Sequence, residues 1–362
     1  MVDGTRARSG LEGVVVADTK LSDVDGERGR LVIAGHDVEE LARTAGFERV
    51  CGLLWGIGPD EAKERVGTGR TRAFEVLPRL GDALGKPAGM DALRASLAHL
   101  VDGGEGAGDA AALTGAAAVF AAAWLRARED RPPIPPDPSH GHAEDFLRMG
   151  LGVSPRPEHA GALDAYLATV SDHGMNASTF AARVVASTGS DMVSSVVAAV
   201  GALKGPLHGG APGPVLDMLD SVGMPSRAAA WVDAELDAGR RIMGMGHRVY
   251  RVRDPRAAVF EKQIEALAAA SAGRAGERLA LARAVEHAAE EALARRHPDR
   301  PLKANVEFFT AVLLEAVGLP REAFSPTFAV GRVAGWCAHW IEQRATGRLI
   351  RPASRYVGPP AA

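Results

Sequence analysis

The 362-residue sequence is poor in cysteine, in aromatic residues and in net charge. Its two cysteines, Cys51 and Cys337, are too few for a disulfide framework, so we expect a reducing, cytoplasmic environment. A formal charge of −3 argues against a general nucleic-acid binder. No export signal follows the first arginines, and the longest apolar run, 110–125, falls short of the ~20 residues that a bilayer span needs. We therefore expect neither nucleic acid nor membrane as a partner, and a core helix at 110–125.

Strict alternation of apolar and polar residues is also scarce, whereas apolar residues three and four positions apart recur over most of the chain. Two short β-like runs stand near the N-terminus, at 13–17 and 30–34, on either side of a turn signal at 23–26. With 46% hydrophobic and 24% charged residues, the composition is that of a globular chain. The prediction is an all-α fold with a small N-terminal β hairpin.

Two breaks divide the helical pattern. A glycine- and proline-rich segment occupies 204–213, and a Gly-Leu-Pro break stands at 318–320. The stretch between them is helical and rich in charge, while the last helix returns to the apolar style of the first half. We therefore expect a large helical domain, 1–210 and 319–362, with a small helical domain, 211–318, inserted into it.

Three of the 11 histidines stand at breaks in the helical pattern, among small residues. They are His173, before a helix that Asn176 or Ser178 would cap, His208 in a Gly-Pro-Leu-His-Gly-Gly segment, and His247 in a Gly-Met-Gly-His-Arg segment. Glycine lets a ligand approach the backbone closely, so such an imidazole can project into a cleft. Each motif alone is as often a structural turn, but together the three predict a site gathered from several loops.

Positive charge is concentrated in one short segment. It contains Arg240, Arg241, Arg248, Arg251, Arg253 and Arg256. Most of these arginines fit a solvated charged face, yet the cluster favours an anionic ligand, because a guanidinium group matches carboxylate and phosphate. Nucleic acid is the weaker alternative, because no aromatic residues for base stacking accompany the arginines.

Glu307 follows a candidate helix cap, Asn305, and has apolar neighbours. It is either a partly desolvated general base or a first-turn carboxylate that offsets the helix dipole, and the residues leave both readings open. No cysteine pair and no His-Glu-x-x-His spacing indicates zinc, so we expect no metal site.

These motifs, in this order, resemble the citrate synthase family, in particular the bacterial subgroup called citrate synthase 2. The matching stretches are 172–180, 205–210, 246–250, 254–256, 305–307, 331–332 and 348–352. The resemblance covers nearly the whole chain. It implies an all-α, two-domain homodimer that condenses acetyl-CoA with oxaloacetate and water to citrate and free CoA, with no metal or organic cofactor.

The resemblance also implies a role for each matching residue. As catalytic residues, His208 would polarise the thioester carbonyl, Glu307 would remove a methyl proton, and His247 would donate a proton to the ketone of oxaloacetate. The oxaloacetate carboxylates would be held by His173, Arg256 and Arg332, with Arg351 reaching in from the partner subunit. CoA would contact Met243, Gly244, Met245, Gly246 and Arg251.

Two alternatives remain open. One is a 2-methylcitrate synthase that uses propionyl-CoA, because one methylene in an apolar pocket discriminates by only ~1–3 kcal/mol. The other is a non-catalytic acyl-CoA or dicarboxylate sensor that keeps the fold. Glu307 motivates this second alternative, because the family usually has the shorter Asp at that position, although the citrate synthase 2 subgroup shares the Glu.

Overall fold

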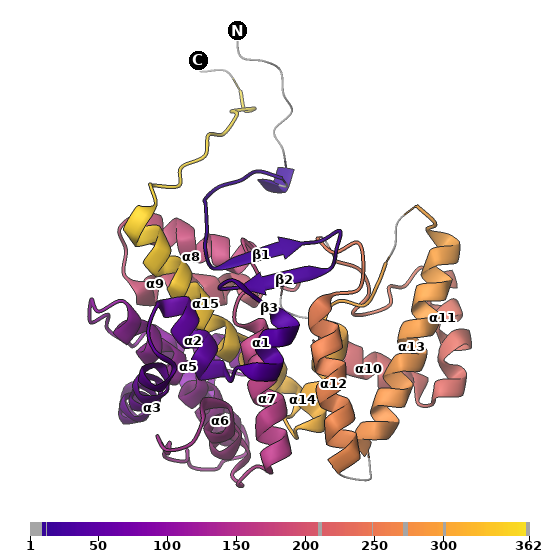
Figure 1. The fold of residues 1–362 in the computed structure, drawn as a ribbon, viewed down its shortest axis with the longest axis horizontal. Helices are drawn as coiled ribbons and strands as arrows, with labels where there is room; N and C mark the ends of the chain where they lie inside the picture. The colour runs from indigo at the N-terminus through magenta and orange to yellow at the C-terminus, as the bar shows by residue number, and fades with distance from the viewer. Residues whose placement is uncertain are drawn as a thin grey trace.

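Helices account for most of the chain, and the all-α fold class is confirmed. The computed structural model describes residues 9–11, 13–208, 212–247, 249–270, 274–299 and 302–359, and these ranges contain fifteen α-helices (Figure 1). In the first half they are α1 (Val38–Thr44), α2 (Phe47–Trp55), α3 (Pro59–Val76), α4 (Gly89–Leu97), α5 (Ala107–Arg128), α6 (His142–Leu151), α7 (Pro157–Val170), α8 (Ala177–Ser187) and α9 (Met192–Leu203). In the second half they are α10 (Pro212–Val222), α11 (Ala228–Asp237), α12 (Pro255–Ala270), α13 (Arg274–Arg296), α14 (Val306–Ala316) and α15 (Phe324–Thr346).

A small antiparallel sheet precedes α1. Its strands, in spatial order, are β1 (Ser22–Asp25), β2 (Arg30–Ile33) and β3 (His36–Asp37). The predicted hairpin is confirmed, but the first strand predicted at 13–17 is wrong, because β1 begins only at Ser22. A turn directly after β1 allows β1 to pair with β2. In this turn the Asp25 carboxylate accepts the backbone N–H of Glu27 at 3.1 Å, and the chain reverses its direction. Val15, in the middle of the rejected strand, is 84% exposed.

The long apolar run of the first half forms α5, which is buried along most of its length. By length and composition alone this helix could cross a membrane, yet nearly all of it lies inside the fold. It packs against α3, α4, α6 and α15. The predicted core helix at 110–125 is confirmed.

Two glycines let α15 approach the C-terminal end of α7, and this contact positions part of the site. A Cβ at Gly335 would overlap a carbonyl oxygen of the turn after α7, and one at Gly331 would lie 2.7 Å from a methyl group of Val170. Arg332, between the two glycines, is thereby held against the same turn, where its Nε–H donates to the Val170 carbonyl at 2.5 Å. That turn carries His173.

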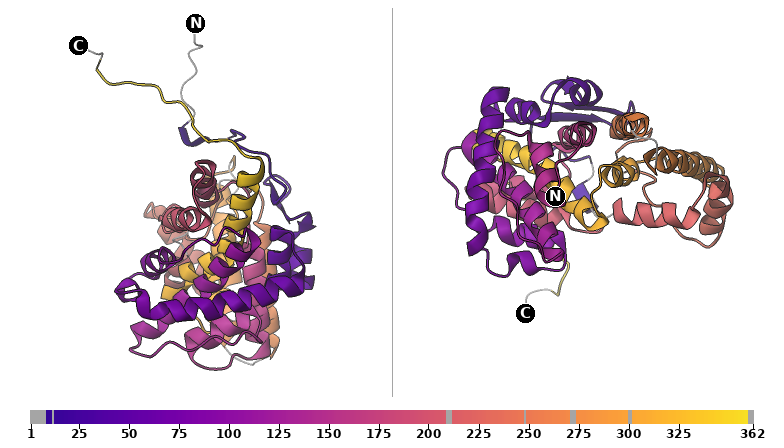
Figure 2. Two further views of the ribbon diagram at one scale, coloured as in Figure 1. Left: turned by 90° about the vertical axis from the view of Figure 1, so that its left-hand side faces the viewer. Right: turned by 90° about the horizontal axis from the view of Figure 1, so that it is seen from below.

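Helices α10, α11 and α13 gather on one side of the molecule, and α2, α3, α5 and α6 lie on the other (Figure 1 and Figure 2). Between the two groups, α12 packs against α1 and α7, and α14 packs against α7 and α10. Helices α10 to α14 fall within the inserted domain predicted at 211–318. Its boundaries stay a prediction, and residues 209–211 lie outside the described part of the chain.

We expect Gly335→Ala to destabilise the protein by about 1–3 kcal/mol, because the added methyl group forces α15 away from α7. Gly161→Ala is the matched control, since Gly161 lies in α7 at a point where a Cβ meets no atom within 4 Å. That change should be neutral or should stabilise by about 0.5–1 kcal/mol. Chemical denaturation followed by circular dichroism measures both variants, and equal stabilities would contradict the close contact.

Candidate active site

His173 lies in the turn between α7 and α8, with 8% of its surface exposed. The turn ends where Asn176 caps α8: its Oδ1 accepts the backbone N–H groups of Ser178 and Thr179, both at 3.1 Å. Of the two caps that the sequence allowed, the structure uses Asn176. Ser178 follows in the first turn of α8, where its hydroxyl also donates to the Asn176 Oδ1 at 2.7 Å.

The fully buried carboxylate of Asp172 fixes the start of the same turn. It accepts a hydrogen bond from the Ser22 hydroxyl and bonds to Nε2 of His339 at 3.1 Å. Burial alone would raise the pKa of Asp172, but His339, Ser22 and Arg332 together hold that pKa below its ordinary value. Asp172 is therefore ionised, and its charge stabilises the buried Arg332 guanidinium.

His208 follows α9 and contacts the first turn of α8. The Ser178 N–H donates to Nε2 of His208 at 3.2 Å, and the Ser178 hydroxyl lies 2.9 Å from the same nitrogen. Because an amide N–H can only donate, Nε2 is an acceptor, and the neutral ring carries its proton on Nδ1. Burial, and then Arg332, lowers the pKa of His208 to about 4, so the ring is a neutral Nδ1–H donor. Gly209 and Gly210 of its motif lie outside the described residues.

His247 has the opposite tautomer. The backbone N–H groups of Val249 and Tyr250 point at its Nδ1, at 3.0 and 3.1 Å, so the neutral ring carries its proton on Nε2. Burial, and then Arg256, lowers the pKa of His247 to about 4, against a smaller opposing effect of Asp254. His247 therefore presents a neutral Nε2–H donor.

Tyr250 joins two of the histidines, and sequence analysis assigned it no role. Its hydroxyl is 3.1 Å from Nε2 of His173, and its ring lies 4.8 Å from that of His247, centre to centre. The rings of His173 and His247 meet edge to face at 5.7 Å. The three rings thus form one cluster, and the place of Tyr250 in the motif 246–250 is the signal that could have identified it.

Glu307 lies in the first turn of α14, and hydrogen bonds tie this helix start to the predicted CoA loop. Asn305 caps the helix through Oδ1, which accepts the Glu307 N–H at 3.0 Å. The Asn305 Nδ2 donates to the Gly246 carbonyl, and its backbone N–H donates to the Gly244 carbonyl, both at 2.9 Å. Because His247 directly follows Gly246, these bonds hold the base candidate and His247 on neighbouring segments.

The loop itself is folded tightly against α14. Gly244 and Gly246 have φ values of +74° and +86°, which residues with a side chain rarely adopt. A Cβ at Gly244 would also lie 2.9 Å from the ring of Phe308. Met243 and Met245 pack beside the core, and Met245 pairs with the chain before α14. The glycines of this motif are therefore required by the backbone, whatever the loop binds.

Two buried guanidinium groups complete the cluster. Arg256, at the start of α12, bonds to Asp254 through Nε and Nη2, at 3.0 and 2.7 Å. Arg332 lies over the ring of Phe328 at 4.7 Å, and its buried Nη2 has no hydrogen-bond partner among the described residues. Burial lowers the pKa of Arg332 to about 10, so the group is still charged near pH 7. A buried and partly unpaired guanidinium indicates a place for an anion.

Electrostatic effects link these groups to one another. Besides burial, Arg256, Arg332 and His247 lower the pKa of His173. For Arg256, burial is opposed by Asp254, Tyr250 and Glu307, which raise its pKa. Arg332 also acts on His208 and Arg256 on His247, so each of six predicted site residues is electrostatically linked to at least one of the others. They are His173, His208, His247, Arg256, Glu307 and Arg332.

Two other arginines of the basic segment pair with carboxylates. Arg240 pairs with Glu235 at 2.6 Å, and Arg253 pairs with Glu286 at 2.7 Å. Arg251 is half-exposed and 3.9 Å from a carboxylate oxygen in the β1–β2 turn, and Arg248 lies outside the described residues. Within the described ranges, no group of three or more His, Cys, Asp and Glu side chains is arranged to hold a metal ion.

Histidine-selective ¹⁵N labelling tests the two tautomers. We expect His247 to be the Nε2–H form and His208 the Nδ1–H form, with both neutral at about pH 6. In the folded protein both pKa values are about 4 instead of 6.5, so between these pH values the unfolded chain binds more protons than the folded one. The free energy of unfolding therefore decreases as pH drops through this range. Long-range ¹H–¹⁵N spectra, assigned with His208→Gln and His247→Gln, report tautomer and charge. The same tautomer in both rings would contradict the geometry.

Comparison with known proteins identifies relatives that align with nearly the whole chain. The family profile described as "Citrate synthase, C-terminal domain" matches residues 10–353. The citrate synthase of Haloferax volcanii is 37% identical, with 97% of this chain and 96% of the relative covered. A Mycobacterium tuberculosis relative of the citrate synthase 2 group is 39% identical, with 97% and 92% covered.

Solved structures give the same result. The Thermotoga maritima citrate synthase superimposes with a TM-score of 0.85 at 34% identity, covering 99% of this chain and 97% of that one. The Thermoplasma acidophilum enzyme, in a ternary complex with carboxymethyl coenzyme A and oxaloacetate, gives 0.86 at 29% identity, covering 98% and 96%. The predicted resemblance is confirmed over the full length, and the chain belongs to the citrate synthase family.

Proposed function

We propose that this chain condenses acetyl-CoA with oxaloacetate and water to give citrate and free CoA. The observation that carries the proposal is the pair of neutral imidazoles with opposite tautomers, each set by backbone N–H groups. Each ring presents an N–H donor, so the site can stabilise negative charge on two different oxygen atoms. Glu307 supplies a carboxylate in the same cluster. A proton abstraction and a carbonyl addition need this combination of groups.

His208 and Glu307 act on acetyl-CoA. The Glu307 carboxylate removes a proton from the methyl group, and the C–H electron pair moves toward the thioester oxygen. The Nδ1–H of His208 donates a hydrogen bond to that oxygen as its charge develops. A neutral imidazole suits this step, because its N–H keeps its proton near pH 7 and stabilises the enolate oxygen by hydrogen bonding alone.

His247 acts on oxaloacetate. The enolate carbon attacks the ketone carbon, a C–C bond forms, and the Nε2–H of His247 supplies the proton that the new alkoxide needs. Water then attacks the thioester carbonyl and gives a proton back to the deprotonated His247. The departing CoA thiolate takes the proton held by Glu307 and leaves as the free thiol, which restores both side chains. Movement of the inserted domain would exclude water while the enolate exists and admit it for this last step.

The buried cations hold the substrate. Oxaloacetate carries two carboxylates, which Arg256, Arg332 and His173 would bind. The buried Nη2 of Arg332, for which the described part of the chain offers no hydrogen-bond partner, supports this assignment. CoA contacts Arg251 and the loop Met243, Gly244, Met245 and Gly246, which is bonded to the start of the helix that carries Glu307.

All steps use acid–base groups of the chain, so we propose that neither a metal ion nor an organic cofactor takes part. We also propose a cytoplasmic enzyme that supplies citrate to the tricarboxylic acid cycle. Both Cys51 and Cys337 are buried free thiols, which supports a reducing location.

Purified protein should release free thiol only when acetyl-CoA and oxaloacetate are both present. We expect Glu307→Gln to lower kcat by about 10²-fold or more, because an amide cannot accept the proton, while oxaloacetate binding persists. Glu322→Gln, at an exposed position before α15, is the matched control and should be fully active.

Propionyl-CoA in the same assay separates citrate synthesis from 2-methylcitrate synthesis, because the preferred acyl-CoA has the higher kcat/KM. Tight binding of both ligands without turnover would identify a sensor and refute the proposal.

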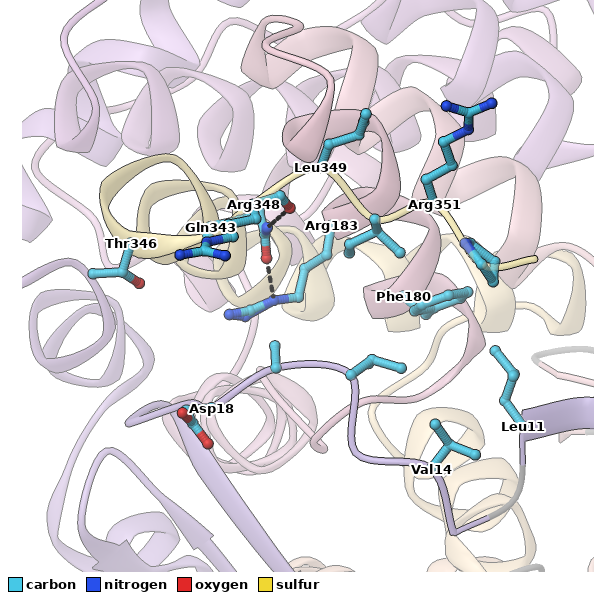
Figure 3. A pocket seen from close by; sticks show the side chains of 15 residues that line it. Leu11, Val14, Asp18, Phe180, Arg183, Gln343, Thr346, Arg348, Leu349 and Arg351 are labelled. Atoms are coloured by element: carbon cyan, nitrogen blue, oxygen red, sulfur yellow. Dashed lines mark hydrogen bonds between the residues drawn. The ribbon is translucent and has the colours of Figure 1, made fainter. Parts of the chain in front are cut away.

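A homodimer in which the partner subunit's Arg351 completes the site is part of the proposal. The segment after α15 first passes α8, where the Ile350 N–H donates to the Ser187 hydroxyl at 3.1 Å, and then extends away from the helices of its own chain (Figure 1). Large apolar side chains in it and in the N-terminal segment are exposed, among them Leu349 at 58% and Val357 at 82%. Both segments line a pocket of about 570 Å³. Arg351 is one of the lining residues, and its side chain points away from Arg183 (Figure 3). Exposed apolar surface of this kind is typical of an interface.

Mixing two inactive variants tests the shared site. In a heterodimer of Arg351→Ala and Glu307→Gln, an Arg351 that acts across the interface restores one complete site, whereas an Arg351 that acts within its own chain restores none. Refolding an equal mixture should therefore recover about a quarter of the wild-type activity, since half of the dimers are mixed and each has one working site. No recovery in mixtures that size-exclusion chromatography shows to be dimeric would contradict the proposal.

A further inference from the structure

The β1–β2 hairpin contacts both of the loops that present His173 and His247. At its base, the Ser22 hydroxyl donates to the Asp172 carboxylate and accepts the backbone N–H of Gly174 at 2.9 Å. Ser22 therefore bonds to the residues on either side of His173. The hairpin also packs here, since a Cβ at Gly174 would lie 3.2 Å from a methyl group of Val24.

At its tip, the hairpin lies against the segment that follows His247. The Arg251 N–H donates to the Gly26 carbonyl at 2.9 Å. A Cβ at Gly26 would overlap the backbone carbonyl of Val249, and one at Gly29 would lie 2.6 Å from a methyl group of Val252. Only glycine leaves room for this approach of two backbones.

The contact at Gly26 matters because Val249 helps to orient His247. The Val249 N–H is one of the two donors to His247 Nδ1 that set the tautomer. The Val249 side chain is 44% exposed and anchors the segment only weakly, so its position depends on backbone contacts. The hairpin, in contrast, is firmly held, because Leu31 and Ile33 of β2 are fully buried.

We propose that Ser22 and Gly26 are positioning residues of the active site: through one rigid hairpin they fix the His173 turn and the His247 loop relative to each other. The two residues lie more than a hundred positions from either histidine in the sequence, and neither touches a group that reacts. This inference rests on the proposed function, because its readout is the condensation of acetyl-CoA with oxaloacetate.

The two ends of the hairpin should have different kinetic effects. Gly26→Ala pushes the Val249 backbone away and misplaces the proton donor, so we expect kcat to fall roughly tenfold to a hundredfold. Ser22→Ala loosens the His173 turn, so we expect mainly a rise in KM for oxaloacetate, with a smaller change in kcat. KM for acetyl-CoA should change little in either variant.

Gly85→Ala is the matched control for Gly26→Ala, because a Cβ there meets no atom within 4 Å and its φ is negative. Ser22→Thr, which keeps the hydroxyl, should retain an oxaloacetate KM close to wild type. Thermal denaturation separates the effects from unfolding, and ¹⁵N spectra of Gly26→Ala should show a shifted His247 Nδ1 in the folded protein.

Wild-type kinetics in Gly26→Ala and Ser22→Ala would overturn the inference while leaving the proposed function intact. A loss of activity that parallels a loss of folded protein, with an unshifted His247 resonance, would also overturn it. Absence of thiol release from the wild-type protein would instead refute the proposed function, so the two failures are distinguishable.

Discussion

Burial of imidazole groups beside guanidinium groups is the constraint on which the site depends. Water would allow His208 and His247 to accept a proton near their ordinary pKa, and a protonated ring has no acceptor nitrogen left for a backbone N–H. Desolvation and the nearby Arg332 and Arg256 prevent this, and both rings stay neutral. The same electrostatic arrangement therefore keeps the cations available for an anion and the histidines available as donors.

The geometry of the site is maintained by main-chain contacts rather than by side-chain packing alone. Amide groups fix both tautomers. The helix caps at Asn176 and Asn305 fix the turn that carries His173 and the start of the helix that carries Glu307, and the glycines at 331 and 335 bring α15 against α7. The two helix caps and the amide contacts of His247 are local in sequence. The bond between Ser178 and His208 and the contact of α15 with α7 are not, because they join segments that are far apart in the chain.

This difference explains what the sequence could and could not predict. Helix caps and the core helix leave local signals, and these predictions were confirmed. The glycine-flanked histidines leave a similar local signal, and the fold brings the rings of His173 and His247 into contact. The strand at 22–25 left none, since Ser-Asp-Val-Asp shows no apolar alternation and becomes a strand only through pairing with β2. The role of Tyr250 depends on a hydroxyl group that meets His173 from another loop. Ion pairs such as Arg253–Glu286 likewise need the tertiary fold before structural arginines can be told from binding ones.

The hydrogen bonds of Asn305 have a consequence for how much of the CoA moiety a thioester substrate needs. The side-chain amide of Asn305 bonds both to the loop at 244–246 and to the first turn of α14. A change in the position of the loop would therefore also shift Glu307. If the loop binds CoA as proposed, recognition of the distant nucleotide end of the thioester would help to aim the Glu307 carboxyl group at the methyl carbon. A shortened thioester that lacks this handle would then suffer in turnover as well as in affinity, as expected when remote contacts supply energy for alignment at the reacting atoms.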